Sequence, residues 1–243
     1  MKNSKKGFTI IELVIVLVIV ALIITGILGG QYLIEISRMQ TLSKEITQYA
    51  ALHTRFQEQY KQLPGDMDNA FTIWGTNCAN TSARCNGTGN LIYDNQTETY
   101  KAWKHFELSK ILDTTFTAIT ADSHADCEVG NRYPKLSLDG ISFGFISVDN
   151  DAESSTSTTS YSTSLMRISS VPLSCSNLGK GLLTGDQIKF IDEKIDDGFA
   201  YSGKVITSQS IGDCTDSAAD EDDANYVSGS KPECVLWYIL KTF

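Results

Sequence analysis

The chain has 243 residues, which is enough for one large domain or two small ones. Hydrophobic residues make up 42% and charged residues 20% of it, a composition that excludes both a disordered tail and a multispanning membrane protein. The formal net charge is −9, so the surface repels phosphate backbones and we expect no nucleic-acid partner.

The N-terminus combines a short basic segment with a long apolar run. Residues 1–7 contain three lysines, and residues 8–28 (FTIIELVIVLVIVALIITGIL) contain one ionisable side chain, Glu12. A helix of this length is about 31 Å long, enough to span the hydrocarbon core of a bilayer. The lysines predict that residues 1–7 stay in the cytoplasm and that the chain after residue 30 faces outward.

Glu12 lies inside the apolar run, where an isolated carboxylate costs about 2.5–3.5 kcal/mol. One interpretation is that it reaches the membrane interface or stays protonated. The other is a paired charge, because cleavage after Gly7 would place the new amine of Phe8 one helical turn away. A neighbouring subunit could then offer its own amine to this carboxylate and fix the axial register of a helical bundle.

The segment KKGFTIIEL (residues 5–13), with the uninterrupted apolar run after it, resembles the class III signal of type IV prepilins and type II secretion pseudopilins. The resemblance implies that a prepilin peptidase cuts between Gly7 and Phe8 and methylates the new amine of Phe8, and that Glu12 is the assembly carboxylate. It also implies a single-pass protein of the bacterial inner membrane with its head in the periplasm. Its partners would be other pilin or pseudopilin subunits, the inner membrane and the assembly platform.

Beyond the apolar run the sequence predicts that the helix continues to about Gln62. The basis is an apolar stripe with 4-3-4-3-4 spacing, formed by Leu42, Ile46, Tyr49, His53, Phe56 and Tyr60. The residues LPGD (63–66) then end the helix. Three glycines at the end of the membrane run, Gly26, Gly29 and Gly30, indicate either close helix packing or a bend during assembly, and both interpretations stay open.

The remaining chain predicts short helices and mostly local strands, which is an α+β pattern. The expected elements are a loop at 76–98, a helix at 99–113, an exposed polar loop at 151–164, a short helix from the capping box at 184–187 to about 194, and strands at 135–149, 164–173, 204–209 and 235–242. Residues 60–70, 102–112 and 191–203 also resemble a group of larger pilin-like proteins.

The pilin resemblance implies a lollipop-shaped fold, in which a long N-terminal transmembrane helix packs on a mostly antiparallel β-sheet head. The expected division is a leader at 1–7, a helix at 8–62 whose residues 8–28 cross the membrane, and an extracytoplasmic head at 63–243.

Six cysteines form an even set, which permits disulfides outside the cytoplasm. Six cysteines allow about 15 connectivities, and the sequence does not select among them. We expect Cys78–Cys85 and Cys214–Cys234 and, by elimination, Cys127–Cys175. The resemblance makes the second pair the disulfide-bounded region that pilins often display. No CxxC pair or histidine cluster supports a zinc site.

Acidic residues near the C-terminus have two main interpretations, a solvated surface and a calcium site. The turn at Asp196 and Asp197 has a third, structural one, in which either carboxylate accepts backbone N–H groups. The candidate ligands are Asp196, Asp197, Asp213, Asp216, Asp220 and Asp222. Flexible oxygen-rich loops suit Ca²⁺, although the spacing is not that of an EF-hand. Some secretion pseudopilins bind Ca²⁺ in a C-terminal loop, which the resemblance makes relevant here. We expect no other cofactor.

The sequence offers little support for catalysis. It contains no HExxH, no GxSxG and no phosphate-cradling glycine loop. Of its three histidines, His53 and His105 are expected to pack and His124 to lie in a solvated loop. We therefore expect a structural subunit, and the large head favours a minor one. The alternatives are a pilus-tip adhesin or ligand-binding module on a pilin stalk, and a membrane-tethered enzyme.

Overall fold

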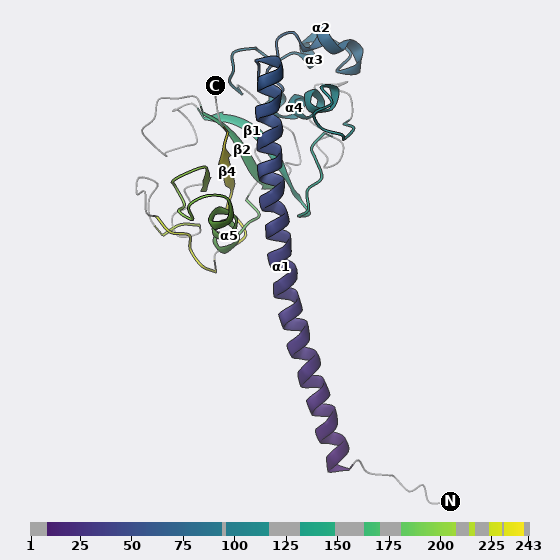
Figure 1. The fold of residues 1–243 in the computed structure, drawn as a ribbon, viewed down its shortest axis with the longest axis vertical. Helices are drawn as coiled ribbons and strands as arrows, with labels where there is room; N and C mark the ends of the chain where they lie inside the picture. Colours follow the sequence, from purple (N-terminus) through teal and green to yellow (C-terminus); the bar gives the residue numbers. More distant parts are fainter. Residues whose placement is uncertain are drawn as a thin grey trace, which may run out of the picture. The chain divides into compact units, whose positions relative to one another are not determined.

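The computed structural model describes residues 9–93, 96–116, 132–148, 163–170, 181–207, 214–216, 224–229 and 231–240. The chain divides into two compact units, Met1–Gln40 and Thr41–Phe243. Helix α1 (Ile10–Tyr60) contributes to both (Figure 1). It ends two residues before the expected Gln62, because Lys61 adopts a left-handed φ of 57° while its N–H donates to the Gln57 carbonyl at 2.8 Å.

The first unit is helical from Ile10 onward. The helix continues through the three glycines, and the Thr25 hydroxyl donates to the Ala21 carbonyl one turn earlier at 2.8 Å. Among the described residues, α1 is long and apolar enough to cross a membrane, with a mean hydropathy of 3.2 over its most apolar window.

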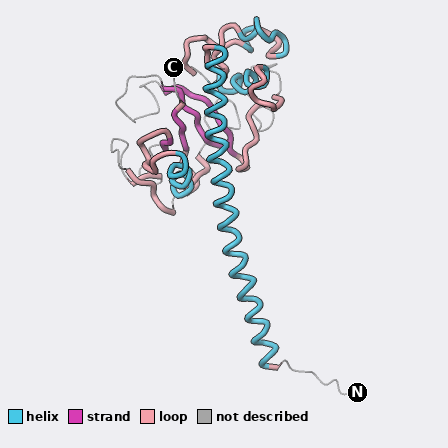
Figure 2. Tube along the Cα trace, in the orientation of Figure 1, coloured by secondary structure: helices cyan, strands magenta, loops and turns pink. Residues whose placement is uncertain are grey.

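The second unit contains a four-stranded antiparallel sheet in the order β1-β2-β4-β3. Figure 2 draws its strands in magenta. The strands are β1 (Ile141–Val148), β2 (Thr163–Ser170), β3 (Val205–Thr207) and β4 (Leu236–Ile239). All four expected strands form within the described residues, and β1 begins six residues later than expected. Residues 149, 171–173, 208–209 and 241–242 of the expected ranges lie outside the described residues. The expected polar loop at 151–164 runs too far, because Thr163 and Ser164 pair with β1; its residues 151–162 lie outside the described residues.

Four α-helices other than α1 and one 3₁₀ turn occur in the described residues of this unit. They are α2 (Ala70–Trp74), η1 (Gly75–Asn77), α3 (Ser82–Cys85), α4 (Gln96–Leu108) and α5 (Gly185–Ile195). The expected loop at 76–98 therefore holds short helical turns. The helix expected at 99–113 begins at Gln96 and ends at Leu108, and Lys110 takes a left-handed φ of 59° just after it. The predicted capping box of α5 is confirmed.

The outer part of α1, Thr41–Tyr60, packs on one face of the sheet, as the apolar stripe predicts. Within it, Leu42, Ile46, His53 and Phe56 are fully buried. Tyr49 meets Phe143 of β1 edge-on at 4.9 Å between ring centroids, and His53 lies 5.4 Å from Phe145. Trp103 of α4 closes the same core, 5.0 Å from Phe145. The α+β expectation is confirmed.

Candidate functional site

Helix α1 starts with three hydrogen bonds that join Thr9 and Glu12 reciprocally. The Thr9 N–H and hydroxyl both donate to Glu12 Oε2, at 2.9 and 2.8 Å, and the Glu12 N–H donates to Thr9 Oγ1 at 3.4 Å. This Thr-x-x-Glu turn is a capping arrangement that holds the carboxylate beside the positive end of the helix dipole. Gly7 and Phe8, which are expected to flank the cleavage, lie outside the described residues.

Apolar side chains cover the surface of α1 after Glu12. From Ile10 to Ile34 the large apolar side chains are exposed by 44–86%. No charged residue occurs between Glu12 and Glu35. Exposed apolar surface on this scale is typical of a membrane segment or of an interface with other helices.

Two buried histidines lie in the head, and both expectations of packing are confirmed. His105 Nδ1 accepts the Gly65 N–H at 2.9 Å, and its Nε2 faces the Cys85 carbonyl at 3.0 Å, so the neutral ring is satisfied at both nitrogens. His53 Nε2 bonds Tyr93 Oη at 3.0 Å, whereas its Nδ1 is buried without a partner. Burial lowers the pKa of each histidine to about 3. His124 lies outside the described residues.

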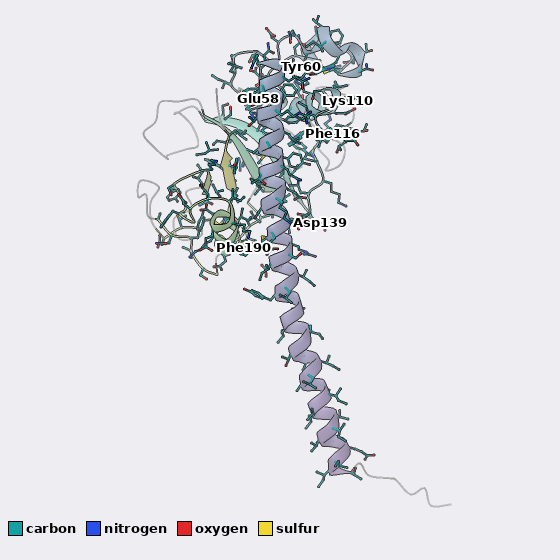
Figure 3. The ribbon with its side chains drawn as sticks, in the orientation of Figure 1. Glu58, Tyr60, Lys110, Phe116, Asp139 and Phe190 are labelled. Atoms are coloured by element: carbon teal, nitrogen blue, oxygen red, sulfur yellow. A yellow bond between two sulfur atoms is a disulfide. The ribbon has the colours of Figure 1, made fainter. Side chains whose placement is uncertain are left out.

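The aromatic rings around His105 come from the C-terminal end of α1 and from α2. Phe56 stacks on His105 with centroids 6.4 Å apart, and Trp74 lies 5.1 Å from the imidazole. Tyr60 lies at the end of α1 (Figure 3). Its ring contacts those of both Phe56 and Trp74. The histidine is therefore part of an apolar core and is not available as a metal ligand.

Two of the expected disulfides are present in the described residues. Cys78 pairs with Cys85 across 7 residues, and Cys214 pairs with Cys234 across 20. Both pairs are fully buried. The expected Cys127–Cys175 pair lies outside the described residues. The sulfurs of Cys78 and Cys85 are near His105, but because they are bonded to each other they offer no thiolate to a metal.

The acidic candidates separate into two groups. Asp196 and Asp197 lie together at the end of α5, and each carboxylate is held by the loop that follows. Asp196 Oδ2 accepts the N–H groups of Lys204 and Val205, and Asp197 accepts the Phe199 N–H and the Ser202 hydroxyl. Asp216 is elsewhere, where its Oδ1 accepts the Asn225 N–H at 2.8 Å. Asp213, Asp220 and Asp222 lie outside the described residues.

Asp192 joins Asp196 and Asp197, although the sequence candidates did not include it. One carboxylate oxygen from each of the three lies within 4.8 Å of the other two. Asp192 has no exposed surface; its Oδ2 accepts the Tyr226 hydroxyl at 2.8 Å, and its Oδ1 is buried without a hydrogen bond. Burial raises the pKa of Asp192 to about 7. The signal that could have found it is the i, i+4 spacing of Asp192 and Asp196 on one helix face.

A cavity of about 180 Å³ lies beside the end of α1, lined by Gln57, Glu58, Lys61 and Leu91. Its volume is below the roughly 300–1,000 Å³ of typical small-molecule sites. It therefore gives little support to a ligand-capturing head.

Comparison with known proteins finds no curated protein and no solved structure that matches the chain. Residues 2–28 match the family model of the prokaryotic N-terminal methylation motif. This match covers Gly7, Phe8 and Glu12 at the spacing described above, and it also covers most of the exposed apolar part of α1. The chain therefore carries the N-terminal signal of type IV prepilins and pseudopilins.

Proposed function

We propose that the chain is a structural subunit of a type IV pilus or a type II secretion pseudopilus. The observation that carries this proposal is the methylation motif at residues 2–28, joined to a helix whose apolar side chains are exposed by 44–86%. Before assembly these side chains would be buried in the inner membrane, with the head in the periplasm. After assembly they would be buried among the helices of neighbouring subunits.

Maturation would begin with cleavage between Gly7 and Phe8 by a prepilin peptidase, followed by methylation of the Phe8 amine. Cleavage removes three lysines and makes the chain more acidic. It also creates a cation at the start of the helix, four residues before Glu12. This chemistry favours a structural role, because cleavage and methylation change the start of the helix and create no site for a substrate.

Glu12 would pair with the Phe8 amine of a neighbouring subunit. The Thr9 hydrogen bonds support this role, because they fix the position of the Glu12 carboxylate at the start of the helix before a neighbouring subunit arrives. In an apolar bundle, breaking such a pair on one side costs about 3–5 kcal/mol, since the remaining charge stays buried. The pair would therefore determine whether a subunit enters the fibre and would fix its axial register.

The test compares Glu12→Ala and Glu12→Gln with Glu35→Gln, an exposed glutamate farther along the same helix. The fraction of each protein in sheared fibres is measured against the fraction left in the membrane. We expect all three variants to lose the leader, both Glu12 variants to fall at least about tenfold in fibre incorporation, and Glu35→Gln to assemble like wild type. Normal assembly of Glu12→Ala would contradict the proposed pairing.

A further inference from the structure

The cavity at the end of α1 matches the size of one large side chain. It holds about 180 Å³ and is lined by buried Gln57 and by three exposed residues, Glu58, Lys61 and Leu91. An engineered cavity of about 150 Å³ is enough to hold a benzene molecule. The cavity is therefore too small for a typical small-molecule ligand but large enough for the ring of a single side chain.

Two residues that line the cavity have strained backbones. Lys61 has a φ of 57° and Leu91 a φ of 64°, a left-handed conformation that is uncommon for residues other than glycine. Asp66 holds Leu91 in place, because its buried carboxylate accepts the Leu91 N–H at 2.7 Å. Leu91 nevertheless keeps 49% of its surface exposed. Strain of this kind is typical of sites that clamp a partner.

The polar groups of the cavity lack partners. Gln57 Oε1 is buried without a hydrogen bond, which is costly for an amide oxygen. Glu58 and Lys61 are three residues apart, yet within the described part of the chain neither side chain forms an ion pair. The cavity thus combines an apolar wall, an amide oxygen and an unpaired ammonium group. This combination suits an aromatic ring, whose positive edge tolerates an oxygen and whose face attracts a cation.

An exposed aromatic ring lies elsewhere on the head. The large apolar side chains that stay exposed in the described part of the head are Ile73, Leu91, Leu182 and Phe199. Phe199 is the aromatic one, exposed by 41% in the turn after α5, where the Asp197 carboxylate accepts its N–H at 3.0 Å. The negative charge of Asp197 beside this ring is complementary to Lys61 at the cavity. Figure 1 shows α5 well away from the end of α1, so a second copy must supply the ring.

We propose that the cavity receives the Phe199 ring of a second copy of this chain in the fibre. The contact presupposes the proposed function, because a fibre sets copies of the head along one axis. It joins two different places on the same chain, and repetition of such a heterologous contact builds an open filament instead of a closed ring. The Phe199 ring fills the space between Gln57 and Leu91, Lys61 covers its face, and Asp197 lies near Lys61.

The test places a photo-crosslinker at the ring and identifies its neighbour in assembled fibres. Phe199→benzoylphenylalanine is made in the full chain, the fibres are irradiated and sheared, and the cross-linked peptides are identified by mass spectrometry. We expect links to residues 57–61 or to Leu91 of a second copy. Leu182→benzoylphenylalanine is the matched control, because Leu182 is also exposed and apolar, and it should not link to the cavity.

Two substitutions test the contact without a probe. Phe199→Ala and Lys61→Glu should each lower the fraction of the chain in sheared fibres at least about tenfold, since aromatic side chains that fill a pocket dominate the energetics of an interface. Leu182→Ala should assemble like wild type. All three variants should keep the wild-type Tm within about 2 °C, because the altered side chains are exposed.

The outcomes separate this contact from the proposed function. Fibres that contain the chain but give links from Phe199 to another protein, or to a different part of the head, would overturn the contact and leave the proposed function standing. Normal assembly of both Phe199→Ala and Lys61→Glu would overturn it as well. Absence of the wild-type chain from fibres would refute the proposed function, and the contact would then have no second copy to supply the ring.

Discussion

The two buried histidines should differ in what they contribute to stability, although they share one core and the same neutral state. His105→Phe preserves the ring between Phe56 and Trp74 but removes the acceptor for the Gly65 N–H and the partner of the Cys85 carbonyl. Each of these buried backbone groups then lacks a hydrogen bond, at about 1–3 kcal/mol apiece. We expect His105→Phe to lower the free energy of unfolding by about 2–6 kcal/mol.

His53→Phe is the matched control. It breaks the single hydrogen bond to Tyr93 Oη, but it also removes a buried nitrogen that has no partner. These effects oppose each other, so we expect a loss below about 2 kcal/mol. The difference between the variants therefore reports the two backbone hydrogen bonds of His105 and not the loss of an imidazole as such.

The assay is urea unfolding of the full chain in detergent, followed by tryptophan fluorescence. Trp74 and Trp103 lie in this core, and Trp74 is 5.1 Å from the imidazole of His105, so the signal reports the affected region. Equal losses for the two variants, or a larger loss for His53→Phe, would show that the backbone contacts of His105 do not carry the stability assigned to them.

Three further predictions concern the head. Burial lowers the pKa of both histidines from 6.5 to about 3, so their contribution to stability is complete above pH 6.5 and is lost as the pH falls toward 3. Between about pH 7 and 5 the free energy of unfolding of His53→Phe should therefore fall by about 2 kcal/mol less than that of wild type. Equal falls for the two proteins would refute this. Gly65→Ala should cost about 2–5 kcal/mol in urea unfolding, because φ is +89° and a Cβ would overlap the Glu98 carbonyl; a neutral effect would refute this packing. Replacing Cys214 and Cys234 by serine should lower the free energy of unfolding by about 3 kcal/mol, because the unfolded chain gains loop entropy. This is about 1 kcal/mol more than the loss expected for the shorter Cys78–Cys85 loop. A larger loss for the shorter loop in thermal unfolding would contradict this reasoning.

Features set by neighbouring residues were predictable from the sequence. The methylation motif, the apolar stripe of α1 and the capping box at Thr184 and Gln187 all depend on spacings of a few residues. The Thr9–Glu12 pair is equally local, and its Thr-x-x-Glu pattern would have indicated it. In these cases residues three or four positions apart in one helix lie next to each other, so their spacing in the sequence predicts their contact.

Features set by distant segments were not predictable. Asp66 looks like a helix-ending residue in the LPGD turn, yet its buried carboxylate accepts the N–H groups of Thr88, Gly89 and Leu91 more than twenty residues away. These bonds order the chain through the short helices that the sequence predicts as a loop. Asp192 likewise accepts a hydrogen bond from the Tyr226 hydroxyl, 34 residues away. No local spacing encodes either contact.

The proposed function requires that this chain mature as a prepilin and enter a fibre through its N-terminal helix. The most direct measurement is the mass of the N-terminal peptide of the protein recovered from sheared fibres. We expect the peptide to begin at Phe8, to carry one methyl group on its amine and to retain Glu12. A peptide that begins at Met1, or an unmethylated Phe8 in assembled fibres, would contradict it.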